Sequence, residues 1–293
     1  MGAIEKAVAQ IKEQQDSNVT SGFPRHERLR VTDQPNTLRA ANSSLVQSRG
    51  TAFALPYKEL EAEGMVEPAG KRNQLSEEYR AIKRPILSAI DNANHSGLEH
   101  GNIVMVTSSV SGEGKTFTAI NLAISIAMER DRTVLLVDGD VTNPSTGQRL
   151  GFSPSHPGLT DVLLDTAMNI NDVICQSDIP NLRFLPAGGS AHHVTELLSS
   201  RDMQFLLQNL STSYKDQVIV FDSAPMLMTS EASVVADLAG QIVFVVGAES
   251  TTRGMVSDAL KMINDHNRIG FVLNKIRKKQ SNIYGYGYGY GYG

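Results

Sequence analysis

Apolar runs and helix-sized intervals alternate through the last two thirds of the chain. After Gly101, six short runs rich in Val, Ile, Leu and Phe are separated by stretches long enough for helices. Continuous apolar strands of this kind are typical of parallel sheets that are covered on both faces. The pattern therefore predicts a doubly wound α/β domain with a mostly parallel sheet. The expected strands are residues 103–107, 133–138, 182–187, 218–222, 241–246 and 270–274.

The two ends of the chain show other patterns. Apolar residues at helical spacing over residues 4–11 predict a short amphipathic helix, and its balanced charges favour packing or partner docking over lipid binding. Residues 15–49 are polar and without periodicity, which predicts a flexible linker. From Ile283 to Gly293 tyrosine alternates with glycine. Glycine loses the most conformational freedom on ordering, so this tail should be disordered when free.

Composition narrows the possible partners and compartments. The 293 residues carry a formal net charge of −4 with a pI near 6.0, which argues against a nucleic-acid partner. The single cysteine, Cys175, cannot form an intramolecular disulfide, and this suits a reducing compartment. No apolar run approaches the ~20 residues that a membrane-spanning helix needs. We therefore expect a cytoplasmic protein that reaches a membrane only through a partner or a surface helix.

Phosphate-binding chemistry is indicated directly after the first expected strand. The eight residues SVSGEGKT, from Ser109 to Thr116, match the P-loop pattern except that serine replaces the first glycine. The glycines let backbone N–H groups approach phosphate oxygens, the next helix directs its positive end at them, and Lys115 adds a charge. The Thr116 hydroxyl is a natural Mg²⁺ ligand. The residues expected to bind nucleotide are Ser111, Gly112, Glu113, Gly114, Lys115, Thr116 and Phe117.

Carboxylates end two further strands of the expected sheet. The segment VLLVDGD places Asp138 at the end of one strand and Asp140 two residues later, and VIVFDSAP places Asp222 at the end of another. Taken alone, an aspartate at a strand end is more often a helix cap or a turn residue. Two such strands following a P-loop in order favour a Mg²⁺ site instead, because this ion prefers oxygen ligands. The expected metal ligands are Thr116, Asp138 and Asp222.

Together these motifs resemble the bacterial tyrosine kinases, which use a P-loop ATPase fold of the deviant Walker A type. In that family the P-loop, often with Ser or Ala for its first glycine, precedes a strand ending D-x-D, matched here by Asp138 and Asp140. A later strand ends D-[ST]-x-P, matched by Asp222, Ser223 and Pro225. The family's C-terminal tyrosine cluster is matched by Tyr284, Tyr286, Tyr288, Tyr290 and Tyr292.

The resemblance covers roughly residues 75–293 and implies an autokinase that uses ATP and Mg²⁺ to phosphorylate its own tail. On this basis we assign Lys115 to the β- and γ-phosphates, Asp138 to activation of the tyrosyl hydroxyl, and Asp140 to support of both. Asn274 stands where related P-loop ATPases contact the adenine base. An asparagine that closes a strand is equally well explained as a turn residue.

A further segment that resembles the family precedes the first expected strand of the domain. The segment EEYRAIK, residues 77–83, resembles the family's E-x-x-R-x-x-R helix, which makes contacts between subunits in a ring. The expected contact residues are Glu77, Arg80 and Lys83, with lysine in place of the last arginine and without its bidentate fork. The alternative is an ordinary solvated helix face. The longer segment EEYRAIKRPIL is similar to the subgroup of exosortase-associated tyrosine autokinases.

The family also implies partners, a location and a division of the chain. The expected partners are a membrane-embedded polysaccharide chain-length regulator as activator, further copies in a ring or dimer, and a tyrosine phosphatase. The regulator would place the chain at the inner face of the cytoplasmic membrane, where exopolysaccharide is made and exported. We divide the chain into a helix and linker over 1–50, an extension with the oligomerisation helix over 51–100, the kinase domain over 101–278 and the tail over 279–293.

Two other functions compete with this interpretation. One is a switch ATPase resembling the septum-positioning and chromosome-partitioning proteins, whose signature lysine early in the loop is absent here because Val110 occupies that position. The other is a binding module that reports nucleotide state to a polysaccharide machine without transferring phosphate. Phosphate transfer to the tail distinguishes the kinase from both.

Overall fold

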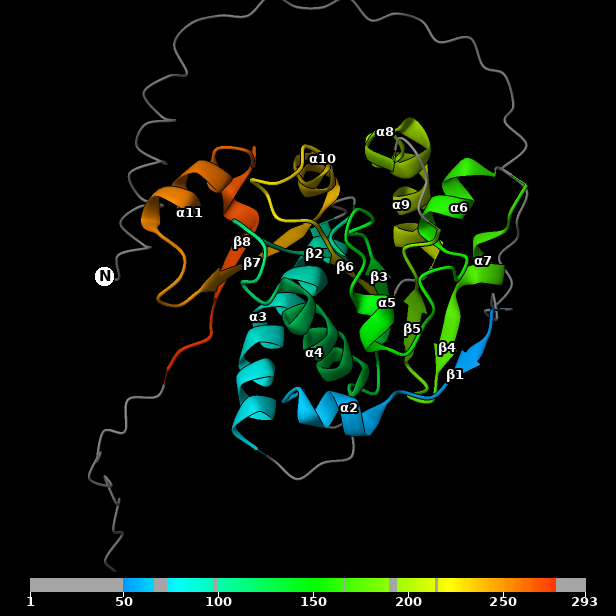
Figure 1. Cartoon of the computed structure of the whole chain (residues 1–293), viewed down its shortest axis with the longest axis horizontal. Coiled ribbons are helices and arrows are strands. Elements are labelled where there is room, and N and C mark those ends of the chain that lie inside the picture. The colour runs from blue at the N-terminus through cyan, green and yellow to red at the C-terminus, as the bar shows by residue number, and fades with distance from the viewer. Residues whose placement is uncertain are drawn as a thin grey trace, which may run out of the picture.

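One mostly parallel sheet of eight strands organises the described part of the chain in this computed structural model (Figure 1). The residues described are 50–65, 73–96, 100–165, 167–189, 194–213 and 216–277. The predicted helix over 4–11, the linker over 15–49 and the tyrosine tail lie outside them. The strand order is β1-β4-β5-β3-β6-β2-β7-β8. The strands are β1 (Ala52–Phe53), β2 (Ile103–Ser108), β3 (Thr133–Asp138), β4 (Cys175–Ser177), β5 (Leu182–Leu185), β6 (Gln217–Asp222), β7 (Gln241–Gly247) and β8 (Ile269–Asn274).

The predicted doubly wound α/β fold is confirmed, and each of the six expected strands occurs within two residues of its predicted ends. Neighbouring strands pair in parallel except β4 and β5, which are antiparallel. The pattern of apolar runs missed β1 and β4. Both are only two or three residues long, and β4 reads Cys-Gln-Ser, so neither has an apolar run to detect.

Two hydrophobic clusters, one on each face of the sheet, form the core. Successive strand residues point to opposite faces, so Ile103 and Met105 of β2 enter one cluster while Val104 and Val106 enter the other. The first cluster is covered by helices α6 to α11 and the second by α2 to α4. The helices are α2 (Tyr57–Ala62), α3 (Gln74–Ser96), α4 (Lys115–Ala127), α5 (Thr146–Arg149), α6 (Leu159–Leu164), α7 (Ile170–Val173), α8 (Val194–Leu198), α9 (Arg201–Ser213), α10 (Glu231–Leu238) and α11 (Arg253–Leu260), with a 3₁₀ turn at His266–Arg268.

The extension before the P-loop is joined to the rest of the fold. Strand β1 adds to the sheet edge beside β4, and α3 packs lengthwise against α4, the helix that follows the P-loop (Figure 1). Tyr79, Ile86 and Ile90 of α3 are buried in the second cluster. Across the residues that the structure describes, none of the helices is both long and apolar enough to cross a membrane.

Candidate active site

The segment with the P-loop pattern forms the turn between β2 and α4. Gly112 and Gly114 have φ angles of 83° and 101°, in the left-handed region that favours glycine. Helix α4 begins at Lys115, and among the described residues no side chain caps its first turn. Its free N–H groups and its dipole therefore favour an anion at this end. Ser111 is exposed on the turn, whereas the Phe117 ring packs against the second core cluster.

The Glu113 side chain holds this loop from within the protein. It is only 2% exposed, and one carboxylate oxygen accepts a hydrogen bond from the Val110 N–H at 2.6 Å. The other oxygen accepts hydrogen bonds from the Gly247 N–H at 3.2 Å and from the Thr251 hydroxyl. The Glu113 carboxylate thus ties the loop to the end of β7 and is not free for the predicted nucleotide contact, which would have to use the backbone N–H.

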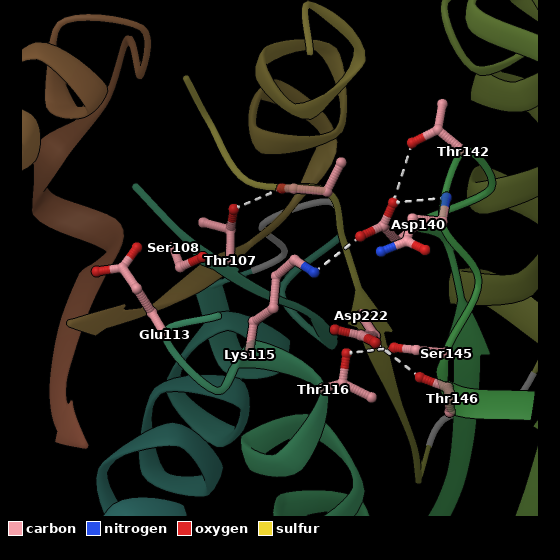
Figure 2. A network of polar contacts seen from close by, with 12 residues as sticks. Thr107, Ser108, Glu113, Lys115, Thr116, Asp140, Thr142, Ser145, Thr146 and Asp222 are labelled. Carbon is pink, nitrogen blue, oxygen red and sulfur yellow. Dashed lines mark hydrogen bonds and ion pairs between the residues drawn. The ribbon is translucent and has the colours of Figure 1, made fainter. Parts of the chain in front are cut away.

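Lys115 and Asp140 form an ion pair at the centre of the site (Figure 2). The Lys115 Nζ lies 2.7 Å from Asp140 Oδ2, and the two side chains are 10% and 3% exposed. The second Asp140 oxygen accepts hydrogen bonds from the Thr142 hydroxyl at 3.1 Å and the Asn143 N–H at 3.3 Å. Asp140 is thereby fixed on both sides, and it keeps the lysine ammonium at the mouth of the P-loop.

Asp138 and Asp222 lie side by side at the carboxyl ends of β3 and β6, where they are register partners. Both are fully buried. Asp138 Oδ2 accepts a hydrogen bond from the Gly147 N–H at 3.0 Å, and Asp222 Oδ2 accepts one from the Thr146 hydroxyl at 2.6 Å. The Oδ1 atom of each carboxylate has no hydrogen-bond partner within the described part of the chain. Two buried acceptors are thus left for a ligand that the protein itself does not supply.

Burial makes both carboxylates hard to ionise. Burial, followed by the neighbouring charge of Asp222, raises the pKa of Asp138 to about 8. Burial also raises the pKa of Asp222 to about 6, and the ammonium of Lys115 and the hydroxyls of Thr146 and Thr116 limit the rise. At neutral pH Asp138 is therefore largely protonated in the nucleotide-free protein, and a nearby cation should release that proton.

The oxygen atoms at this point fit a Mg²⁺ ion. Thr116 Oγ1 lies 3.0 Å from Ser145 Oγ and close to Asp222 (Figure 2). This hydroxyl is a third oxygen at the site, in addition to the unpartnered Oδ1 atoms of Asp138 and Asp222. Hard oxygen ligands of this kind are the ones that Mg²⁺ prefers. Among the described residues, no group of three or more His, Cys, Asp or Glu side chains could hold a metal by itself. A bound Mg²⁺ would therefore take its other ligands from phosphates and water.

Three residues at the start of α5 complete the site, and the sequence analysis did not find them. Ser145, Thr146 and Gly147 supply the hydroxyls and the N–H that contact Thr116, Asp222 and Asp138. A serine at the position just before a helix, as Ser145 is for α5, is a common signal for a helix start. That signal could have located α5, but it could not have shown that the turn folds back onto the strand ends.

Asn274 and Lys275 reach the outside of the P-loop from the end of β8. Asn274 Nδ2 donates a hydrogen bond to the Glu113 carbonyl oxygen at 2.8 Å, and Lys275 Nζ donates one to the Gly112 carbonyl oxygen at 2.5 Å. The predicted contact between Asn274 and adenine is not tested by these bonds. They do show that the asparagine amide already has a partner in the loop.

The three expected oligomer contacts lie differently from one another on α3. Glu77 and Arg80 are on the surface and form an ion pair of 2.7 Å. Lys83 is only 5% exposed, and its ammonium lies 2.6 Å from the Ser125 carbonyl oxygen and 2.6 Å from Glu129 Oε1. The lysine at the last position of the E-x-x-R-x-x-R pattern is thus engaged within its own chain, at the far end of the P-loop helix.

Comparison with known proteins places this chain in a family. The family model described as AAA domain matches residues 101–269. The putative tyrosine-protein kinase AmsA of Erwinia amylovora is 28% identical over 271 residues, which are 92% of this chain and 34% of AmsA. The tyrosine-protein kinase YwqD of Bacillus subtilis is 29% identical over 213 residues, 72% of this chain and 85% of YwqD. This chain thus spans about a third of AmsA and most of YwqD.

Solved structures agree with the sequence relatives. The crystal structure of the VpsO kinase domain is 31% identical, with a TM-score of 0.55, and the match covers 68% of this chain and all of that domain. The chain therefore belongs to the AAA domain family, and the relatives reported above are named as tyrosine-protein kinases or as a kinase domain.

Proposed function

We propose that the chain is an ATP-dependent protein-tyrosine kinase that phosphorylates its own C-terminal tyrosines. The observation that carries the proposal is the convergence of a P-loop lysine and three aspartates at adjoining strand ends, in a chain whose relatives are named tyrosine kinases. The proposed acceptors are Tyr284, Tyr286, Tyr288, Tyr290 and Tyr292.

Tyr57 and Tyr79, the tyrosines among the described residues, are poor alternatives to the tail. Tyr79 is 4% exposed, and burial raises its pKa to about 12. Tyr57 is 39% exposed, and desolvation together with a hydrogen bond to Asp178 also raises its pKa to about 12. A phenol of higher pKa gives up its proton less readily, and a buried one cannot reach the phosphates. In the tail, a glycine beside each tyrosine imposes little steric limit on entry into a narrow site.

The residues of the site would divide the work of phosphoryl transfer. The N–H groups of the P-loop and the Lys115 ammonium would bind the phosphates. Thr116 and Asp222 would hold Mg²⁺, with Asp138 beside it, and the ion would supply positive charge against the phosphate oxygens. Asp140 would keep Lys115 in position, as it does in the ion pair of 2.7 Å.

Asp138 is suited to accept the proton of the attacking tyrosine. Burial raises the pKa of Asp138 to about 8 without a metal, and a bound cation would release that proton and leave a carboxylate able to act as a general base. Its unpartnered Oδ1 is the free acceptor that this role needs. The tyrosyl hydroxyl, with an ordinary pKa near 10, would therefore lose its proton to Asp138 as its oxygen bonds to the γ-phosphorus. The bond between that phosphorus and the β,γ-bridging oxygen would break at the same step, and ADP would leave.

The setting of this activity is proposed on the same basis. We propose a role in exopolysaccharide synthesis and export, activation by a membrane-embedded chain-length regulator, assembly into a ring or dimer through α3, and reversal by a tyrosine phosphatase. The exposed Glu77 and Arg80 support the assembly. The partner would hold the chain at the inner face of the cytoplasmic membrane.

Incubation of purified protein with Mg²⁺ and ATP, followed by mass spectrometry of tail peptides, tests the proposal. Wild type should acquire phosphotyrosine, whereas Lys115→Met and a variant with all five tail tyrosines changed to Phe should not. Mixing Lys115→Met with the five-Phe variant separates the routes, since tail phosphate can then arise only between chains. ATP hydrolysis without tail phosphotyrosine would refute the kinase and favour the switch ATPase.

A further inference from the structure

Two residues at the end of β8 donate hydrogen bonds to consecutive carbonyl groups of the P-loop. Asn274 Nδ2 donates to the Glu113 carbonyl oxygen at 2.8 Å, and Lys275 Nζ donates to the Gly112 carbonyl oxygen at 2.5 Å. These carbonyls belong to the two peptide units that link Gly112 to Gly114, just before α4. Both donors come from the strand end that leads toward the C-terminal tail.

Holding a carbonyl also fixes the direction of an N–H group. In a planar trans peptide, the C=O of one residue and the N–H of the next belong to one rigid unit and point in opposite directions. The bond from Lys275 to the Gly112 carbonyl therefore sets the direction of the Glu113 N–H. In the same way, the bond from Asn274 to the Glu113 carbonyl sets the direction of the Gly114 N–H.

Both of these N–H groups are available to a ligand. Among the described residues, no hydrogen bond is donated by the backbone N–H of Glu113 or Gly114. In P-loops such N–H groups bind the phosphates of the nucleotide. With their carbonyls held on the side of β8, the two N–H groups face the opposite side of the loop.

We propose that Asn274 and Lys275 are positioning residues that preorient the N–H groups of Glu113 and Gly114 toward the nucleotide phosphates. The inference deepens the proposed function and rests on the nucleotide site named there. It assigns Asn274 to the phosphate end of the nucleotide, through the loop, and it gives a role to Lys275, which the sequence analysis did not single out.

The local backbone is built for this contact. Lys275 has a φ of 60°, an uncommon conformation for a residue with a Cβ, and the Asn274 carbonyl accepts a hydrogen bond from the Ala248 N–H at 2.8 Å. On the loop side, a Cβ atom at Gly114 would lie 1.9 Å from Asn274 Nδ2. Glycine at position 114 therefore permits both the positive φ and the close approach of the asparagine amide.

Binding of ATP and of inorganic tripolyphosphate tests the proposal, because tripolyphosphate has no adenine. Each would be titrated with Mg²⁺ against a fluorescent ADP analogue bound to the full chain. Asn274→Leu and Lys275→Met should each weaken both ligands by about 3- to 10-fold, the value of a net hydrogen bond. Lys275→Arg, which keeps a charged donor, should restore most of the affinity.

A matched control separates the hydrogen bond from bulk charge. Arg277→Met removes the same charge two residues later, from a side chain that is 86% exposed, and should leave both affinities within about twofold. Lys275→Met with no greater effect than Arg277→Met would overturn the role of Lys275. Asn274→Leu that weakened ATP but not tripolyphosphate would overturn the role of Asn274 and support an adenine contact.

Folding and kinase activity are scored separately. Melting of each nucleotide-free variant within a few degrees of wild type shows that the fold is intact, and Asn274→Ser replaces Asn274→Leu if that variant fails to fold. Nucleotide binding does not require phosphate transfer. The absence of tail phosphotyrosine in wild type would therefore refute the kinase proposal without affecting the positioning role of Asn274 and Lys275. Unchanged tripolyphosphate binding in all variants of Asn274 and Lys275 would refute the positioning role alone.

Discussion

Replacing Asp138 with asparagine should stabilise the nucleotide-free protein at neutral and alkaline pH. Burial raises the pKa of Asp138 in the folded protein to about 8, against an ordinary value of 3.8. Between these two pH values the unfolded chain has lost the Asp138 proton while the folded chain has kept it. The native state then binds more protons than the unfolded state, so the free energy of unfolding falls as the pH rises. Asparagine does not titrate, and the variant escapes this loss.

The size of the gain in stability follows from the difference between the pKa values of Asp138 in the folded and unfolded chain. One pKa unit corresponds to about 1.4 kcal/mol, so the interval from 3.8 to about 8 corresponds to on the order of 5 kcal/mol at pH 8 and above. The difference between variant and wild type should close as the pH falls toward about 4. In a chain of this size ~1 kcal/mol moves the Tm by about 2–4 °C, so the variant should melt about 10–20 °C above wild type at pH 8.

Thermal and urea unfolding from pH 5 to pH 8.5, with EDTA and without nucleotide, would measure this difference. The asparagine oxygen can still accept the Gly147 N–H, so the fold of the turn should be kept. Asp258→Asn, at a side chain that is 59% exposed, makes the same charge change and should show no pH-dependent gain. Parallel pH profiles for wild type and Asp138→Asn would refute the reasoning, because the carboxyl would then titrate alike in both states.

Three further predictions concern the site and the helix beside it. Lys115→Met should reduce tail phosphotyrosine by at least ~10²-fold, since it removes a preorganised charge from the transferring phosphates; near-normal labelling would exclude the P-loop from the mechanism. Asp222→Asn should raise the Mg²⁺ concentration needed for activity, whereas Asp138→Asn should lower the rate at saturating Mg²⁺; the opposite pattern would reverse the two roles. Lys83→Met should lower the free energy of unfolding by about 1–3 kcal/mol in urea, because it leaves a carbonyl near the end of α4 unsatisfied; an unchanged midpoint would contradict this.

The strands were predictable because they carry their signal locally. Continuous apolar runs such as VLLVD mark strands that are buried on both faces, and the residues that follow them collect at one edge of a parallel sheet. These two rules are enough to place Lys115, Asp138 and Asp222 near one another from the sequence alone. The short strands β1 and β4 escaped because their pairing depends on neighbours in space and has no periodic counterpart in the sequence.

The partners of those residues could not be read from the sequence. Which hydroxyl meets Asp222 depends on how the turn before α5 folds back, and Thr146 has no distinguishing neighbour in the chain. Lys83 is a similar case, because spacing along α3 predicts a surface contact while the packing of α3 on α4 buries the ammonium. Likewise, the pattern GEGK indicates that Glu113 lies in a P-loop, but only the tertiary structure shows its carboxylate bound to the end of β7.

The charges of the site indicate why its metal-free form lowers the stability of the fold and why a bound divalent ion would restore it. Asp138, Asp140 and Asp222 are all buried, and the ammonium of Lys115 is paired with Asp140. If all three carboxylates ionised, one ammonium would leave an excess of two negative charges in a medium that solvates charge poorly. Instead the pKa of Asp138 rises to about 8, so the site stays partly protonated. A Mg²⁺ ion bound here would carry the missing two charges, and by linkage its binding should release the proton and return the lost stability.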